Sequence, residues 1–386
     1  MWNPCLAALP RHLANHELVA AAWDGLDPSQ VWDSHAHLVG TGDAASGIYV
    51  NPRMASVLNP GLYARRLFFL NGGCVHDVRG SVDRAYVERM HNLVDGLRPG
   101  VKLVLLAFER AHDEQGRPNL DETAFYVPDA YARDVARAHP QHFEWAASIH
   151  PYRADAVEAL EKARADGARA VKWLPAAMGI DPASAKCQKF FEAMQKLDLP
   201  LISHAGLERA VFGHDRQDAG NPLRLRRALD AGVRVVVAHC ASMGEDEDLD
   251  RGGARADSFE LFARMMDDRR YEKHLFGDIS AMTQRNRAGP ALARVLEEES
   301  WHPRLLNGSD YPLPGVMPIF SVDYLVSLQL VAEKAAPLLR EIRAHNPLLF
   351  DFVLKRHLRS HGKGFAAAVF QTRGFFQVES NANVRQ

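Results

Sequence analysis

Residues 31–37, VWDSHAH, form the first of eight short apolar runs along the chain. Several runs are almost continuously apolar and rich in β-branched residues, a pattern typical of parallel strands that are covered on both faces. The other seven are residues 101–108, 143–150, 168–174, 200–206, 233–240, 274–281 and 304–310. The sequence therefore predicts eight buried strands.

Helical patterns fill the intervals between these runs. In residues 155–166 four apolar side chains recur on one helical face, and Gly167 follows as a stop signal. Similar patterns cover residues 183–197 and 223–231. Strands that alternate with helices predict an α/β fold, and eight repeats predict a closed (β/α)8 TIM barrel. A doubly wound open sheet is the alternative, but it needs no eighth strand, and the chain has no glycine-rich nucleotide loop.

The expected organisation is one domain made of an N-terminal extension, the barrel, an insertion and C-terminal helices: residues 1–386, divided as 1–30, 31–312, 38–100 and 313–386. The insertion follows the first strand and is too long for one helical crossover, so we expect it near the barrel mouth. The tail is predicted to be helical at 338–344 and 349–359 and to end in a frayed polar segment. The acidic residues 243–257 are predicted to form a solvated surface loop.

The composition indicates a globular protein that can bury a large core, since 47% of its 386 residues are hydrophobic and 24% are charged. Lys plus Arg number 46 and Asp plus Glu 48, and the net charge of −2 excludes charge-driven binding to nucleic acid or to an anionic membrane. The four cysteines form no C-x-x-C pair, no secretory leader is visible, and no run of roughly 18 apolar residues occurs. We therefore expect a cytoplasmic protein with reduced cysteines that acts on a small molecule, with homo-oligomerisation left open.

Metal-ligating residue types stand near the ends of the predicted strands, where parallel barrels carry their chemistry. They are His35, His37, Lys172, His204, His239 and Asp310. His35 and His37 are two positions apart in one run, so they point to the same side of a strand. A lone histidine there would be an ordinary polar residue, but burying this whole set without a cation would be costly. Imidazoles with a carboxylate are typical ligands of zinc-like ions, so we predict a divalent metal site.

Other polar residues near these strand ends are expected to have structural roles. Asp33 is expected to hydrogen-bond locally, and Cys240 to pack away from His239 as a small hydrophobic residue. Ordinary loop or salt-bridge contacts are expected for Glu109, Arg110, His150, Arg153 and residues 278–283.

The ordered set of motifs resembles the amidohydrolase superfamily. The resemblance lies in D-x-H-x-H at residues 33–37, Val171-Lys172-Trp173, the single histidines of the fifth and sixth runs, and Gly-Ser-Asp-Tyr-Pro around Asp310. Residues 148–151 (SIHP) and 203–206 (SHAG) are similar to the amidohydrolase-2 branch, which holds metal-dependent TIM-barrel hydrolases and some non-oxidative decarboxylases. The resemblance spans residues 31–312 and implies a divalent ion, zinc by first expectation, at the barrel mouth.

The resemblance implies two alternative metal arrangements. In mononuclear members one ion would be held by His35, His37, His204 and Asp310, with His239 close by as base or carbonyl polariser. In binuclear members Lys172, as a carbamate, would bridge two ions, with His204 and His239 on the second.

All of these positions are present, so the pattern alone does not choose between one ion and two. Trp173 is expected to crowd the mouth, which favours a single ion. An unmodified Lys172 would then pair with Asp310 or meet an anionic substrate.

The implied activity is hydrolysis, with a metal-bound hydroxide attacking an amide, lactone or ester carbonyl. Asp310 would take the proton, and the metal or His239 would stabilise the oxyanion. A decarboxylase is the alternative; it would need a cation beside the metal, for which Arg153, Arg216 and Arg224 are candidates. A non-catalytic metal-binding barrel is less favoured, because a structural site needs only a closed four-ligand cage.

Overall fold

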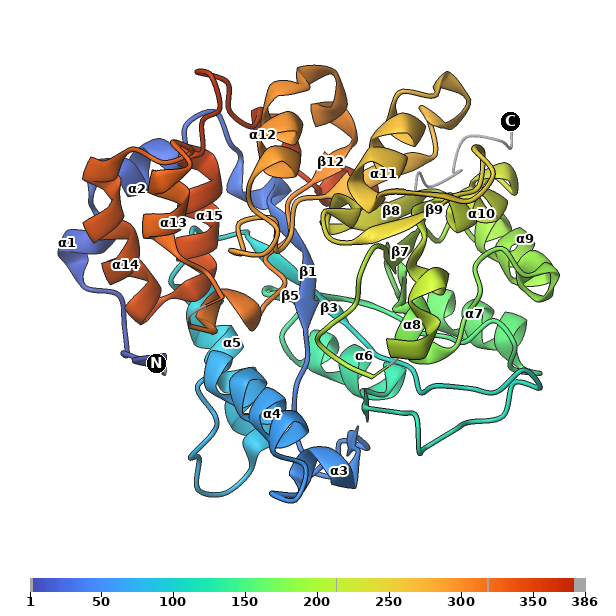
Figure 1. Ribbon diagram of the computed structural model, residues 1–386. Helices are drawn as coiled ribbons and strands as arrows, with labels where there is room; N and C mark the ends of the chain where they lie inside the picture. Colours follow the sequence, from blue (N-terminus) through green and yellow to red (C-terminus); the bar gives the residue numbers. More distant parts are fainter. Residues whose placement is uncertain (1–2, 213, 318, 378–386) are drawn as a thin grey trace, which may run out of the picture.

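The computed structural model describes residues 3–212, 214–317 and 319–377. Its centre is a barrel of eight parallel strands (Figure 1). Two backbone bridges, Ala147 to Val171 and Ala36 to Tyr311, join the two parallel sheets into a closed ring. Each strand lies within one of the predicted runs, so the TIM-barrel prediction is confirmed. The strands are β1 (Trp32–His37), β3 (Lys102–Leu106), β5 (Phe143–Ala146), β6 (Val171–Trp173), β7 (Leu201–His204), β8 (Val235–Ala238), β11 (Leu275–Asp278) and β12 (Leu305–Leu306).

Helices surround the strands and bury one apolar face each. In α9 (Gln188–Lys196) the buried residues include Phe190, Phe191 and Met194. A 3-10 turn precedes α9, and another precedes α10 (Arg226–Asp230), so both α-helices are shorter than the predicted segments. The other helices of this layer are α5 (Val82–Asp95), α6 (Asp129–Ala138), α7 (Ala156–Ala165), α11 (Ser258–Met266) and α12 (Pro290–Glu297).

The barrel interior has an apolar core of its own. It takes residues from seven of the strands or their ends, among them Trp32, Val104, Ile202 and Val236. Phe376, from the short helix α16 (Arg373–Phe376), packs on Trp32 with ring centroids 6.2 Å apart. Side chains alternate along a strand, so His204 shares the inward face of β7 with Ile202.

The C-terminal helices α13 (Val322–Ser327), α14 (Ala336–His345) and α15 (Pro347–His357) pack beside the N-terminal helices α1 (Arg11–Ala14) and α2 (Glu17–Ala22) (Figure 1). The predicted helices 338–344 and 349–359 are thus confirmed. The predicted frayed end, from residue 378 on, lies outside the described residues.

Residues 38–100 contain β2 (Tyr49–Val50), α3 (Pro52–Ala55), α4 (Pro60–Gly72) and α5. The buried carboxylate of Asp83, on α5, accepts hydrogen bonds from Thr41 N at 2.6 Å and Ser46 Oγ at 2.6 Å. Tyr86, one turn further along α5, donates its hydroxyl to His37 O at 2.8 Å. The helix therefore anchors both the loop after β1 and the end of β1 itself.

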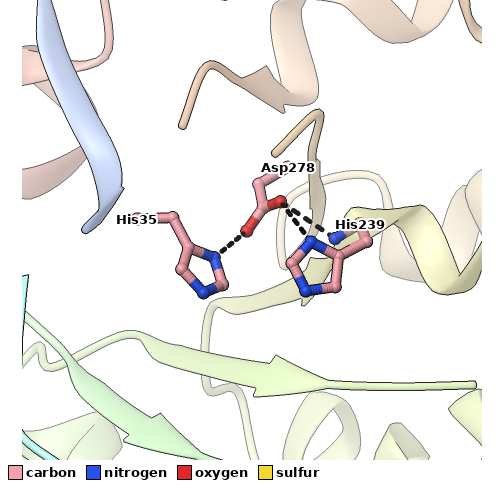
Figure 2. Close-up of side chains that lie close together, drawn as sticks. All are labelled: His35, His239 and Asp278. Atoms are coloured by element: carbon pink, nitrogen blue, oxygen red, sulfur yellow. Dashed lines mark hydrogen bonds and ion pairs between the residues drawn. The ribbon is translucent and has the colours of Figure 1, made fainter. Parts of the chain in front are cut away.

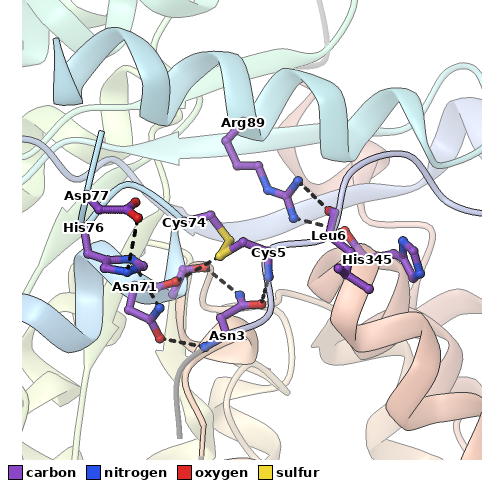
Figure 3. The surroundings of a disulfide bond; sticks show 10 residues. Asn3, Cys5, Leu6, Asn71, Cys74, His76, Asp77, Arg89 and His345 are labelled. Carbon is purple, nitrogen blue, oxygen red and sulfur yellow. Dashed lines mark hydrogen bonds and ion pairs between the residues drawn. A yellow bond between two sulfur atoms is a disulfide. The ribbon is translucent and has the colours of Figure 1, made fainter. Parts of the chain in front are cut away.

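A disulfide between Cys5 and Cys74 ties the N-terminal segment to the end of α4 (Figure 3). Asn3 strengthens this attachment, because its backbone N–H donates to Asn71 Oδ1 at 2.9 Å. The expectation that all four cysteines are reduced is therefore wrong; Cys187 and Cys240 are free and buried. This disulfide does not support the expected cytoplasmic location, because stable disulfides are typical of oxidising compartments. The location stays a prediction.

Replacing Cys5 and Cys74 with serine will destabilise the protein. The crosslink closes a loop of 69 residues, and a loop of that length constrains the unfolded chain by about 4 kcal/mol. Urea unfolding of the oxidised wild type and of the double variant measures the difference. A reducing agent should weaken the wild type to the variant's level and leave the variant unchanged; equal stability of both oxidised proteins would contradict the prediction.

The prediction that the acidic segment 243–257 is a solvated loop is wrong. The segment forms an antiparallel hairpin of β9 (Glu245–Asp248) and β10 (Ala254–Asp257). Asp248 is buried and accepts two hydrogen bonds from Arg264, each of 2.7 Å. Asp246 is also buried and accepts from Ser258 Oγ at 2.7 Å. Alternate acidic side chains thus face inward, where partners satisfy them.

Across the described residues, no helix has the length and apolarity needed to traverse a bilayer.

Candidate active site

The six metal-ligating residues singled out in the sequence meet in one cavity of about 570 Å³. The cavity lies at the carboxyl ends of the strands, as is general for this architecture. Its floor carries His35, His37, Lys172, His204, His239 and Asp310.

His35, His37 and Asp310 form a compact group of possible ligands that faces the cavity. Asp310 Oδ1 lies 3.2 Å from His37 Nε2 and 3.6 Å from His35 Nε2, and one ligand atom from each residue lies within 4.8 Å of the other two. Burial raises the pKa of Asp310, but the hydrogen bond from His37 and the charges around it outweigh burial and leave this pKa lowered. Asp310 is therefore an anion beside two imidazoles, a donor set that fits a divalent cation.

Asp278, which lies between His35 and His239, fixes the orientation of His35 (Figure 2). Its Oδ2 lies 2.8 Å from His35 Nδ1, and its Oδ1 accepts from His239 N at 2.9 Å. A carboxylate oxygen accepts, so Nδ1 of His35 carries the proton and Nε2 offers a lone pair toward Asp310. Lys172 supports the same tautomer, because its Nζ donates to His35 Nε2 at 3.1 Å.

Replacing Asp278 with asparagine will weaken metal binding by about 10–100-fold, the usual effect of losing such a supporting contact. The new amide would donate to His35 Nδ1 and move the imidazole proton to Nε2, the atom that faces Asp310. Competition with a chromogenic chelator gives the dissociation constant. Asp129→Asn is a matched control, because that carboxylate also accepts a hydrogen bond, from Ser148 N, but does not line the cavity. An unchanged affinity in Asp278→Asn would contradict the assigned tautomer.

His239 follows β8 in a strained turn. Residues 239–241 all have positive φ, between 50° and 55°, which is rare for side chains other than glycine and is found mostly at functional sites. His239 Nδ1 lies 3.0 Å from Ser280 O, a carbonyl that can only accept, so Nδ1 carries the proton. Burial, followed by the charge of Arg287, holds the pKa of His239 well below its usual value. Its Nε2, 3.9 Å from Asp310 Oδ2, is thus an acceptor in the resting protein.

His204 lies outside the group formed by His35, His37 and Asp310. Its Nε2 is buried, finds no hydrogen-bond partner among the described residues, and lies 3.4 Å from Glu208 Oε2. Burial lowers the pKa of His204 strongly. A buried imidazole nitrogen without a hydrogen bond is one that a bound cation would satisfy.

Lys172 is buried, and burial lowers its pKa to about 8. No ion pair within 4 Å joins it to Asp310, so the expected pairing is absent from the described part of the chain. The expectation that Trp173 crowds the mouth is wrong. It packs on Phe190 with ring centroids 5.4 Å apart and donates Nε1 to Ile149 O at 2.8 Å, behind the strand. Alternation along β6 sends Lys172 inward and Trp173 outward, so this reason for excluding a second ion fails.

The upper walls of the cavity are apolar and come in part from the insertion. They include Met54, Phe68, Phe69, Phe108, Phe125 and Val316. Arginines stand among them, namely Arg65, Arg66, Arg209, Arg285 and Arg287. Only Arg287 of these five is buried, with 8% of its surface exposed. Its Nη1 lies 3.4 Å from Ser242 Oγ, and its charge acts on Asp310, Glu208 and Asp278.

The arginines named in the sequence as candidate cations do not line this cavity. Arg153 pairs with Glu109 at 2.6 Å, Arg216 pairs with Glu122, and Arg224 pairs with Asp181 at 3.0 Å. Their guanidinium groups serve the loops around the mouth.

Asp33 and Cys240 lie where the sequence placed them. Asp33 accepts from His35 N at 3.0 Å and Ser309 N at 2.8 Å, and Cys240 is buried with Sγ 3.2 Å from Asp278 O. The roles of Asp278, Glu208 and Arg287 were missed. Asp278 ends a strand just as the histidines do, and that position was the available signal; Glu208 and Arg287 stand on loops, for which no sequence signal was available.

Comparison with known proteins places these features in context. The sequence profile of the amidohydrolase family matches residues 32–348. An uncharacterised TIM-barrel protein from Bordetella bronchiseptica superposes with a TM-score of 0.50 and 15% identity, over 81% of this chain and 98% of that chain. A putative 2-pyrone-4,6-dicarboxylic acid hydrolase from Pseudomonas putida gives 0.45 and 16%, over 85% and 99%. A 5-carboxyvanillate decarboxylase from Novosphingobium aromaticivorans, solved with bound manganese, gives 0.46 and 11%, over 90% and 97%. No curated protein sequence matches the chain significantly. At these identities the structural likeness shows the fold alone.

Proposed function

The chain belongs to the amidohydrolase family, and from that premise we propose that it is a metal-dependent hydrolase of an anionic, largely apolar small molecule. The family match also confirms the resemblance that the sequence motifs carry. The observation that supports the proposal best is the meeting of His35, His37 and Asp310 on the floor of an apolar cavity that holds the buried Arg287. The bond attacked is that of an amide, lactone or ester carbonyl.

The proposed cofactor is one divalent ion, zinc by first choice, held by His35, His37, His204 and Asp310. The first two histidines and the carboxylate already lie within ligand spacing, and His204 brings a buried nitrogen that has no hydrogen bond and lies 3.4 Å from Glu208 Oε2. Lys172 remains an amine beside His35. A divalent ion in this position supplies Lewis acidity, which lowers the pKa of water and polarises a carbonyl.

The protein's own groups handle the proton and the substrate. Asp310, which is anionic and is itself one of the proposed ligands, accepts the proton of the attacking water. His239, whose Nε2 carries a lone pair, takes a proton in a later step or helps to hold the cation, but it does not donate a hydrogen bond at the start. The motifs implied two candidate roles for His239, base and carbonyl polariser. The proposed mechanism keeps the role of base and drops that of carbonyl polariser.

The substrate class follows from the cavity walls. Aromatic and aliphatic side chains bury an apolar body and exclude bulk water, while Arg287 offers a buried, planar pair of donors that suits a carboxylate. An uncharged substrate would leave this guanidinium unpaired, at a cost in binding.

A non-oxidative decarboxylase is the second candidate, because Arg287 also meets the requirement for a cation beside the proposed metal ligands. In the hydrolase, the substrate carboxylate that binds Arg287 serves only for recognition. In the decarboxylase, the same carboxylate is the group that leaves as carbon dioxide. The two reactions differ in their products.

The test supplies the metal-loaded enzyme with carboxylated lactones, esters and amides, with the same compounds as uncharged methyl esters, and with carboxylated phenols. Acid release in a pH-stat reports hydrolysis of the lactones and esters, release of free amine reports hydrolysis of the amides, and labelled carbon dioxide reports decarboxylation. We expect hydrolysis of carboxylated carbonyl compounds, poor turnover of the methyl esters and no carbon dioxide. Release of carbon dioxide from the phenols alone would establish the decarboxylase instead.

A further inference from the structure

A second group of metal-ligating side chains lies away from the cavity, near the amino end of β5. His91 and Asp95 are one turn apart on the same face of α5. His142 stands in the turn that joins α6 to β5, directly before Phe143, the first residue of that strand. Helix and turn therefore present three ligands from two separate elements, and none of the three lines the cavity.

The ligand atoms are already close to one another. His142 Nε2 lies 2.8 Å from Asp95 Oδ1, and His91 Nδ1 lies 3.4 Å from Asp95 Oδ2. The three ligand atoms lie within 4.8 Å of one another, and the ring centroids of His91 and His142 are 4.4 Å apart. His139 borders the group, with its ring 5.1 Å from that of His91. Small side-chain rotations would bring the three atoms into one coordination sphere.

Exposure and electrostatics both suit a bound cation. The side chains of His91, Asp95 and His142 are 32%, 53% and 18% exposed, so an ion can enter from solvent and keep a water ligand. The group also stands at the carboxyl end of α5, a helix of 14 residues whose last carbonyls carry partial negative charge. Two imidazoles and one carboxylate prefer Zn²⁺, Cu²⁺ or Ni²⁺ over Mg²⁺ or Ca²⁺, which favour oxygen ligands.

We propose that His91, Asp95 and His142 form a second, peripheral transition-metal site that fastens α5 to the turn before β5. The same helix holds Asp83, which anchors the loop after β1, and Tyr86, which binds His37 O. Metal binding at the far end of α5 stabilises the insertion on the barrel. The amino-terminal face of such a barrel typically serves stability, so the ion acts on folding and takes no part in the reaction.

The test counts zinc per chain after equilibrium dialysis of the full-length protein against micromolar free Zn²⁺. The wild type is compared with His91→Ala/His142→Ala and with His12→Ala/His361→Ala. The latter is a matched control, because each of its two exposed histidines also pairs with one glutamate. We expect the first variant to bind one ion fewer than the wild type and the control to bind the full number.

Two further measurements separate this site from the cavity. Excess Zn²⁺ should raise the melting temperature of His35→Ala/His37→Ala, which keeps the peripheral site, and should not raise it when His91→Ala/His142→Ala is added. Bound Cu²⁺ should show imidazole nitrogen coupling in electron paramagnetic resonance spectra of His35→Ala/His37→Ala, and this coupling should fall when the peripheral histidines are removed. Equal zinc counts in the wild type and in His91→Ala/His142→Ala would overturn the proposal, whatever the outcome at the cavity.

Discussion

Asp310→Asn is expected to lower kcat by roughly 10³–10⁴-fold without unfolding the barrel, since it removes both a general base and an anionic ligand. The amide is isosteric with the carboxylate but cannot take a proton at neutral pH. Residue 310 also has φ of 58°, a left-handed conformation that asparagine adopts as readily as aspartate. The loss therefore reports chemistry and not backbone strain.

Steady-state kinetics on the substrate found by the product screen measures this effect. Asp181→Asn is a suitable control, because Asp181 pairs with Arg224 outside the cavity and should keep nearly full activity. Circular dichroism confirms that both variants fold. If Asp310→Asn kept a tenth or more of the wild-type kcat, Asp310 would not be the proton acceptor.

The second large effect is expected from Arg287→Met, which keeps much of the side-chain volume and removes the charge. A buried charged partner is worth roughly 2–5 kcal/mol, so kcat/KM for a carboxylated substrate should fall by about 10²-fold or more. The uncharged methyl ester should lose little, because it never formed the ion pair.

Arg285 provides the comparison for this prediction. It also lines the cavity, but it is exposed and its guanidinium lies 5.5 Å from the ring centre of Tyr324. Solvent screens such a charge, so Arg285→Met should change kcat/KM only a few-fold. If kcat/KM fell equally for carboxylated and uncharged substrates in Arg287→Met, Arg287 would support the cavity structurally and would not bind the substrate carboxylate.

The barrel was predictable because its strands are buried on both faces. The centre of such a run, for example residues 235–238 (VVVA), is apolar throughout, and the alternation of eight such runs with helical patterns indicates the barrel. The hairpin at 243–257 was not predictable in this way. Its buried carboxylates look like solvated charge until Arg264, on α11, is placed against Asp248.

The floor of the site was predictable in part, because positions two apart share a face of a strand, which keeps His35 with His37 and sends Lys172 inward and Trp173 outward in β6. The irregular register of β1 between Asp33 and Ala36, which lets both Trp32 and His35 face the interior, could not be predicted in this way. The assumption that Trp173 crowds the mouth ignored this periodicity and was wrong. The walls and the disulfide were not predictable. Arg287 reaches the cavity through the path of a loop, and Cys5 meets Cys74 across 69 positions, and neither path can be read from local sequence.

The metal content of His35→Ala/His37→Ala tests the central claim most directly. Wild type and variant are prepared side by side, dialysed against the same free Zn²⁺ and measured by elemental analysis, with circular dichroism to confirm the fold. The account predicts that the folded variant holds one ion per chain fewer than the wild type and has no hydrolase activity. A folded variant that retains the wild-type metal content would contradict it.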